Sequence, residues 1–194
     1  MTVGPEGNLF GGSNQGGDSD NVGTVYELSP PLSGTTLWSN TVLYSFNGVN
    51  GIGCYPFGNV VFDPEGRLYG QTTDCTATFF RLTPPTGSGS WALANLCFIG
   101  QNGGVPDPSL TRDPKTGAFY GTSANGGSGY GQVYQLTPLA GGVSAWTDTL
   151  VHSFTGGSDG YYPIGPLVID ASGVLYGTTY FAGLGYGEAF SITP

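Results

Sequence analysis

The chain has 194 residues, of which 38% are hydrophobic and 9% are charged. The hydrophobic fraction is sufficient for a core, and the 36 glycines, 12 tyrosines and 11 phenylalanines indicate short aromatic strands joined by frequent turns rather than a disordered linker. Four basic residues stand against 13 acidic ones, which excludes a surface that neutralises phosphates. Nucleic acid and anionic membranes are therefore disfavoured as partners, and the net charge of -9 fits solubility or cation binding.

The N-terminal residues carry no targeting signal. Met1 is followed by a segment, Thr2 to Gly7, that has neither a basic region nor an apolar one. No apolar run in the sequence is long enough for a transmembrane helix. We therefore expect no signal peptide within these residues and no membrane span.

One segment occurs as four related copies along the chain. Its fullest copy is LVIDASGVLYGTT, from Leu167 to Thr179, and related copies begin at Thr2, Val60 and Leu110. A second motif, an aromatic residue followed by x-L/I-S/T-Pro, ends at prolines spaced by 54, 54 and 56 residues, namely Pro30, Pro84, Pro138 and Pro194. Periods near 50 residues are typical of propellers and arrays, and the lack of helical periodicity excludes helical solenoids.

Each repeat predicts four antiparallel strands. The best copies of these strands are LVID (167–170), VLYGTT (174–179), QVYQLTP (132–138) and TDTLVHSF (147–154). We therefore predict an all-β fold, a β-propeller of about four antiparallel blades, in which the last blade lacks its fourth strand. The blades are expected at about residues 1–46, 59–99, 109–154 and 166–194 of a single repeat domain, 1–194. A four-bladed ring and a ring completed by oligomerisation both fit this pattern.

The connections between first and second strands have turn chemistry. Each begins with an aspartate, Asp63, Asp113 or Asp170, and ends with a glycine. We expect these aspartates to accept hydrogen bonds from their own turn amides rather than to bind a substrate or a calcium ion.

The remaining loops fall on one rim if consecutive strands are antiparallel, and they are rich in Gly, Asn, Asp and Tyr. Such a rim is where function usually resides, and its tyrosines could stack on sugar rings or hold a peptide. Tyr180 is a rim tyrosine of the same kind. The predicted ligand-binding residues are Tyr55, Tyr130, Tyr161, Tyr162, Tyr186 and Asp159.

The first of these loops has the alternation of a calcium-binding loop. Asp18, Asp20 and Asn21 would supply oxygen ligands, but Val22 and Ser29 stand where further ligands belong, so a full EF-hand is excluded. A looser site formed by Asp18, Asp20 and Asn21 predicts Ca²⁺ as the cofactor.

Three cysteines allow at most one internal bridge, and their spacing matches no zinc pattern. Cys54 and Cys75 fall on the same rim, so a disulfide between them is predicted, with two free thiols as the alternative. Cys97 is expected to be a buried strand residue.

Two further features suggest catalysis only weakly. Residues 156–160 match G-x-S-x-G, but a serine elbow needs a helix after the serine, and here Tyr161 to Pro163 follow. The sole histidine, His152, occupies the fourth-strand position of Tyr44, so we expect it to pack between blades rather than to act as a general base. No catalytic residue is assigned.

The repeat LVIDASGVLYGTT, a glycine-rich loop, QVYQLTP and then W-x-x-T-L-x-x-S-F-T-G-G-x-D-G-x-x-P resembles the bacterial GloVer tandem-repeat proteins over the whole chain. The second repeat departs from the pattern at 74–78 and 95–99. This resemblance implies export and an extracellular or cell-surface location. The first two strands are also similar to NHL-type and gluconolactonase/paraoxonase-like propellers, some of which are calcium-dependent lactonases.

Two functions fit the sequence. The first is a binding or scaffold module that recognises glycan, peptide or another partner through its Gly/Asn/Tyr-rich rim. The alternative is a calcium-dependent hydrolase of the lactonase type. The expected partners are a carbohydrate, a peptide or a small molecule, and the unfinished last blade also suggests a homo-oligomer.

Overall fold

The computed structural model describes residues 1–34, 36–49, 53–74, 77–99, 104–107, 109–139, 145–182 and 185–194. These residues form strands in four antiparallel sheets, and no helix occurs among them. The chain divides into two compact units, Met1–Asn95 (unit 1) and Leu96–Pro194 (unit 2). The prediction of an all-β fold built from four antiparallel, blade-like sheets is confirmed.

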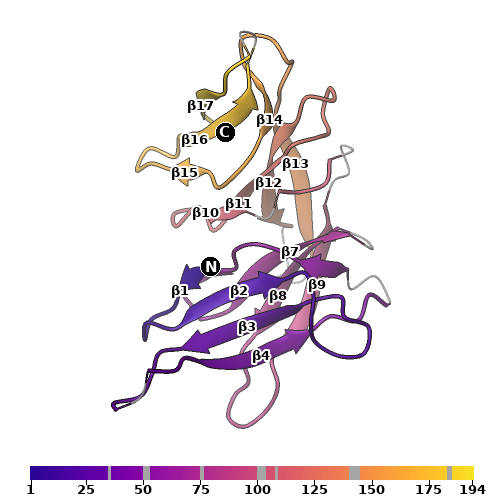
Figure 1. Cartoon of the computed structure of the whole chain (residues 1–194). Helices are drawn as coiled ribbons and strands as arrows, with labels where there is room; N and C mark the ends of the chain where they lie inside the picture. Colours follow the sequence, from indigo (N-terminus) through magenta and orange to yellow (C-terminus); the bar gives the residue numbers. More distant parts are fainter. Residues whose placement is uncertain are drawn as a thin grey trace. The chain divides into compact units, whose positions relative to one another are not determined.

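Unit 1 holds the first two sheets, and the strands of the first sheet follow one another in chain order (Figure 1). The last strand of the second sheet, β9, runs across the boundary between the units. The first sheet contains β1 (Thr2–Val3), β2 (Leu9–Ser13), β3 (Thr24–Ser29) and β4 (Ser39–Ser45). The second contains β5 (Cys54–Pro56), β6 (Val61–Phe62), β7 (Leu68–Asp74), β8 (Thr78–Thr83) and β9 (Ala92–Phe98).

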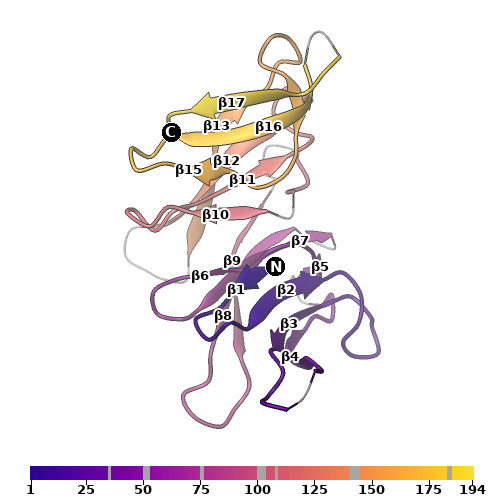
Figure 2. The ribbon, with the colours of Figure 1, turned by 60° about the vertical axis from the view of Figure 1, so that its left-hand side comes forward.

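Unit 2 holds the other two sheets, and Figure 2 shows β15, β16 and β17 as neighbouring strands. The third sheet contains β10 (Leu110–Arg112), β11 (Phe119–Ser123), β12 (Gln132–Pro138) and β13 (Trp146–Ser153). The fourth contains β14 (Tyr161–Pro163), β15 (Val168–Ile169), β16 (Leu175–Phe181) and β17 (Glu188–Ile192). Among the described residues, β17 pairs with β16 alone.

The first strand of the second and fourth sheets is divided, although the repeat predicts one continuous strand. In the fourth sheet, β14 pairs with the C-terminal half of β16 and β15 pairs with its N-terminal half. In the second sheet, β5 pairs with the C-terminal half of β7 and β6 pairs with its N-terminal half. The interruption follows a proline, which has no amide to donate, and contains Gly58 or Gly165 with φ of 98° or 96°.

Within each unit the two sheets pack through aromatic and aliphatic side chains. The Phe46 and Phe80 rings meet edge to face with centroids 5.2 Å apart, and Phe154 and Phe190 repeat this contact in unit 2 at 5.0 Å. The core of unit 1 consists of Phe10, Val25, Leu43, Phe46, Val60, Leu68, Phe80 and Leu82. The core of unit 2 consists of Ala118, Tyr120, Val133, Phe154, Leu167 and Leu175.

A backbone contact joins the two sheets of each unit, and we call it the interblade clamp. In unit 2, Tyr162 N donates to Tyr130 O at 2.9 Å. In unit 1, Tyr55 N donates to Val22 O at 2.7 Å. Both donor tyrosines have left-handed backbones, with φ of 55° for Tyr162 and 57° for Tyr55. The clamp therefore brings the loop before the third strand of one sheet against the first strand of the next.

A glycine next to the clamp leaves room for a proline. Gly131 has φ of 99°, and a Cβ placed on it would lie 2.4 Å from Pro163 Cδ. Gly23 has the same relation to Pro56, at 2.6 Å. At both positions any larger residue would strain the backbone and collide with the next sheet.

The clamp glycine can be tested against a second strained glycine. Gly131→Ala should lower the free energy of unfolding by about 1–3 kcal/mol for backbone strain and by a further ~1–3 kcal/mol for overpacking against Pro163. Gly173 has φ of 92° but open space around it, so Gly173→Ala should cost only the strain. Chemical denaturation of both variants measures the difference. Equal losses would contradict the steric role of Gly131.

Candidate functional site

The turn aspartates accept hydrogen bonds from the amides of their own turns, as predicted. Asp63 Oδ1 accepts from the Glu65 and Arg67 amides at 3.0 and 2.9 Å. Asp113 accepts from the Lys115 amide in the same way. Asp170 Oδ1 accepts from two amides of its turn, those of residues 172 and 174. The carboxylates of these turns are therefore engaged in local hydrogen bonds.

Asp63 is buried, and Arg67 Nε lies 2.5 Å from its Oδ2 atom. Burial opposes ionisation, but hydrogen bonds from the backbone and side chain of Arg67 outweigh it and hold the pKa of Asp63 below its ordinary value of 3.8. The ionised form of Asp63 therefore stabilises the folded state.

This pKa shift predicts a loss of stability in acid. A carboxyl group whose pKa is lowered by folding stabilises the protein above its unfolded pKa, and this contribution disappears as the pH falls through the folded value. The free energy of unfolding should thus decline below about pH 4, and Asp63→Asn should weaken that decline. Denaturant unfolding between neutral pH and pH 2 measures both effects. Glu6→Gln, at an exposed turn, is the matched control. An unchanged pH profile in Asp63→Asn would contradict the assignment.

The predicted calcium ligands lie in an exposed loop with local hydrogen bonds. Asn21 Oδ1 accepts from the Gly16 amide at 2.7 Å, and Asp18 Oδ1 accepts from the Asp20 amide at 3.3 Å. Among the described residues, no three His, Cys, Asp or Glu side chains form a group that could hold a metal ion. That finding does not cover a site with an Asn ligand, so the calcium site of Asp18, Asp20 and Asn21 stays a prediction.

The cysteines occupy unlike positions. Cys54 is buried in β5, whereas Cys97 in β9 is a half-buried free thiol. Burial and the nearby charge of Asp148 raise the pKa of Cys97 to about 12, so this thiol is unreactive at neutral pH. Cys75 lies outside the described residues, and the Cys54–Cys75 disulfide stays a prediction.

Reduction provides the test of this bridge. Closing a loop of the length between Cys54 and Cys75 is worth about 3 kcal/mol, so dithiothreitol should lower the free energy of unfolding by roughly that amount. Denaturant unfolding with and without the reductant measures the loss. The Cys97→Ser variant should show the same loss as the wild type. Identical curves for reduced and unreduced protein would mean that the thiols are free.

Four of the predicted rim tyrosines meet in unit 2. Tyr161 lies 5.9 Å from Tyr130 and 5.4 Å from Tyr162, measured between ring centroids. Tyr161 also stacks on Phe181 at 5.0 Å, and Tyr180 contacts Phe181 edge to face at 4.6 Å. We call these five residues the tyrosine cluster. Long loops and strand ends from two sheets supply it, as the predicted division of the loops requires.

The cluster presents ring surface to solvent. Tyr130 is 45% exposed and Tyr180 is 63% exposed, while Tyr161 is half-buried between its neighbours. Two other predicted residues do not join it. Tyr55 belongs to unit 1, and Tyr186, which is 80% exposed, makes no described ring contact with the cluster. The cluster thus has a half-buried ring, Tyr161, between the more exposed rings of Tyr130 and Tyr180.

Unit 1 has the same backbone without the aromatic side chains. The strand pair Tyr161↔Phe181 of unit 2 corresponds to Cys54↔Asp74 of unit 1. The interblade clamp likewise matches Tyr130 to Val22. The same strand pairing and clamp therefore form with Cys, Asp and Val at these places, and the aromatic rings are particular to unit 2.

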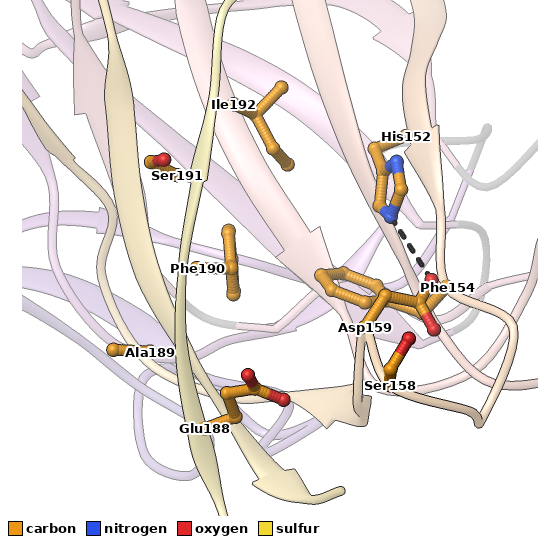
Figure 3. Close-up of a pocket in the computed structure, with 9 residues that line it drawn as sticks. All are labelled: His152, Phe154, Ser158, Asp159, Glu188, Ala189, Phe190, Ser191 and Ile192. Carbon is orange, nitrogen blue, oxygen red and sulfur yellow. Dashed lines mark ion pairs between the residues drawn. The ribbon is translucent and has the colours of Figure 1, made fainter.

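A cavity of about 410 Å³ opens beside the cluster, between β13 and β17. Figure 3 shows the side chains of Phe190 and Ile192 on β17 and those of His152 and Phe154 on the other side of the cavity. His152 is half-buried and lines this cavity between a strand of the third sheet and a strand of the fourth, in agreement with its expected position between blades. Its ring contacts Phe154 edge to face at 4.7 Å.

The loop of residues 155–160 separates the cavity from the tyrosine cluster. A Cβ on Gly156 would lie 2.5 Å from the Tyr130 ring, so the loop packs against that ring. Asp159 accepts from the Thr155 amide at 3.0 Å and from its hydroxyl at 2.5 Å, and His152 Nε2 lies 3.5 Å from its Oδ2 atom.

Burial opposes ionisation of Asp159, but the hydrogen bonds from Thr155 and the nearby His152 lower its pKa below the ordinary value. Asp159 therefore stabilises the loop of residues 155–160 through its hydrogen bonds with Thr155. Ser158 also lines the cavity, on a loop followed by strand β14 rather than by a helix.

Sequence reasoning missed the aromatic partners on β16 and β17. Phe181 lies in the centre of the tyrosine cluster, and Phe190 forms a wall of the cavity. The signal for Phe181 was available, because Asp74 and Asn125 stand at the corresponding place of other repeats, where a phenylalanine is the exception.

The arrangement defines a class of protein: a repeat protein of propeller-like antiparallel blades with an exposed aromatic surface on one unit. The sequence matches the Gloeobacter/Verrucomicrobia repeat family over residues 1–194, and the chain belongs to that family. This confirms the resemblance to the GloVer repeat proteins. A comparison with curated proteins finds no match. The described part of the chain contains no helix that could serve as a membrane span.

Proposed function

We propose that this repeat protein is a carbohydrate-binding module and that the tyrosine cluster of unit 2 is its binding surface. The observation that carries the proposal is the gathering of aromatic rings in unit 2, where Tyr161 contacts Tyr130 and Phe181 and where Tyr180 contacts Phe181. Unit 1 has no aromatic ring at the places of Tyr130, Tyr161 and Phe181. A repeat-based binding or scaffold role follows from the family, and the carbohydrate is the more specific part of the proposal.

The chemistry of tyrosine supports this ligand class. A tyrosine ring offers a large flat apolar surface at low conformational cost, and its hydroxyl can donate and accept hydrogen bonds. A sugar has apolar faces and hydroxyl groups that suit both properties. The cluster itself contains no charged side chain, and the chain has a net charge of -9, so a neutral glycan fits better than an anionic ligand.

Exposed aromatic residues also carry a cost that a binding role explains. Contiguous apolar surface on a soluble protein promotes association, and such patches commonly mark binding sites. Gly156, in the loop of residues 155–160, packs against the Tyr130 ring, and this contact orients the ring before a ligand binds. A cell-surface location, expected from the family resemblance, would bring the cluster into contact with glycans.

Two substitutions test the proposal. Tyr180→Ala and Tyr130→Ala should each weaken binding to a retained neutral polysaccharide by about tenfold, because truncation of an aromatic anchor costs more than ~1 kcal/mol. Affinity electrophoresis against β-glucan, mannan, xylan and chitin oligosaccharides identifies the glycan, and calorimetry measures the change.

The control is Phe57→Ala, which removes an exposed aromatic ring of unit 1. This variant should bind as the wild type does, and all three variants should keep the wild-type melting temperature within a few degrees. Retention of every glycan at wild-type strength by Tyr180→Ala and Tyr130→Ala would refute the proposal. Failure of the wild type to bind any of the glycans would refute it as well.

The alternative, a calcium-dependent hydrolase, stays a prediction. Ser158 and His152 line one cavity, but Asp159 accepts a hydrogen bond from the Thr155 hydroxyl. Among the described residues, no three His, Cys, Asp or Glu side chains form a group that could hold a metal ion. No observation in unit 2 favours hydrolysis over binding.

A further inference from the structure

The sole histidine of the chain and a predicted ligand-binding aspartate form an ion pair beside the tyrosine cluster. His152 Nε2 lies 3.5 Å from Asp159 Oδ2, and Figure 3 shows this pair as a dashed line. The His152 ring also contacts Phe154 edge to face at 4.7 Å, and the Phe154 amide donates to Gly131 O at 2.9 Å. These contacts hold the ring within reach of the carboxylate.

The same carboxylate closes the loop of residues 155–160. Asp159 accepts hydrogen bonds from the amide and the hydroxyl of Thr155, at 3.0 and 2.5 Å. Beside this pair, Gly156 N donates to Gly160 O at 3.3 Å. A carboxylate that is held more firmly therefore also holds Thr155, and Gly156 after it, more firmly.

Gly156 is the point at which this loop meets the tyrosine cluster. A Cβ placed on it would lie 2.5 Å from the Tyr130 ring, so the loop backbone packs against that ring. The Tyr130 ring in turn contacts Tyr161, with centroids 5.9 Å apart. A continuous series of contacts within unit 2 therefore connects the histidine, the aspartate and the loop to the binding surface.

We propose that the charge of His152 regulates the tyrosine cluster, so that the ligand binds more tightly at mildly acidic pH. Histidine is the side chain that changes its charge between about pH 5 and pH 8. Protonation strengthens the pair with Asp159, and the loop then keeps the Tyr130 ring in the position in which it meets the ligand. A ring that is ordered before binding loses less entropy on binding. This inference rests on the proposed function, because it concerns the same surface.

The charges around the histidine favour this assignment. Burial opposes ionisation of Asp159, but hydrogen bonds from Thr155 and the nearby His152 lower its pKa below 3.8, so the carboxylate stays charged between about pH 5 and pH 8. Glu188 of β17 also lines the cavity, but the ion pair of His152 among the described residues is with Asp159. On its own strand the other charged residue is Asp148, four residues or about 13 Å away.

The pH dependence of binding tests the proposal. Calorimetry with β-glucan, mannan, xylan and chitin oligosaccharides should give an affinity for the retained glycan that is about two- to fivefold higher near pH 5 than near pH 8, the range of a partly exposed ion pair. His152→Gln should bind at both pH values as the wild type does at the higher one. Glu188→Gln is the matched control and should keep the pH dependence.

The outcomes separate the two proposals. A wild-type affinity that is the same at both pH values would overturn the regulation by His152 and leave the binding function standing. A pH dependence that persists unchanged in His152→Gln would overturn it as well.

Nuclear magnetic resonance of the ligand-free chain gives a readout that does not depend on the glycan. The chain has one histidine, so its ring resonances follow the titration without ambiguity. The ring resonances of Tyr130, assigned by comparison with Tyr130→Phe, should shift together with those of the histidine in the wild type and stay constant in His152→Gln. Tyr130 resonances that do not follow the histidine would contradict the proposal, whether or not a glycan binds.

Two alanine variants test the contact between the loop and the ring. Gly156→Ala places a methyl group where the Tyr130 ring lies, so it should change the Tyr130 resonances. Gly66 has the same φ of 77° but open space around it, so Gly66→Ala adds the same backbone strain and should leave these resonances unchanged. Wild-type Tyr130 resonances in Gly156→Ala would show that the loop does not position the ring, which would overturn the proposal.

Discussion

The interblade clamp is the constraint on which the rest of each unit depends. A left-handed tyrosine donates its amide to the preceding loop, and a glycine with positive φ leaves space for the following proline. All of these interactions involve the backbone or the absence of a side chain. The clamp therefore fixes where the loops lie while neighbouring positions can differ, and this freedom allows unit 2 to carry aromatic rings where unit 1 carries none.

The comparison of the two units separates structural residues from candidate functional ones. Tyr55 and Tyr162 occupy the same place in the two units, where each supplies the clamp amide. Tyr161 is not shared, since Cys54 takes its place. Aromatic rings that unit 1 lacks at the corresponding places support the proposal that unit 2 binds a ligand. The same reasoning assigns Asp63 and Asp159 to the fold, because their carboxylates fasten local turns and loops.

A second difference between the units concerns apolar burial. Phe80 is fully buried beneath the strand next to it, whereas Phe190 occupies the same register with solvent on one side. Burying an exposed aromatic or aliphatic side chain is worth roughly 1.5–3 kcal/mol. The half-buried Phe190 therefore contributes less to the stability of unit 2 than Phe80 contributes to that of unit 1.

The sequence by itself determined the repeat, the all-β class and the turn aspartates, because strand alternation and turn chemistry depend on residues a few positions apart. It also predicted that the loop tyrosines share a rim, and four of them meet in unit 2. Only the tertiary structure decided that Tyr130, Tyr161 and Phe181 touch, that His152 lines a cavity, and that Ile192 is half-buried. These outcomes depend on strand register and on packing between sheets, which join residues far apart in the chain. No local pattern encodes such contacts.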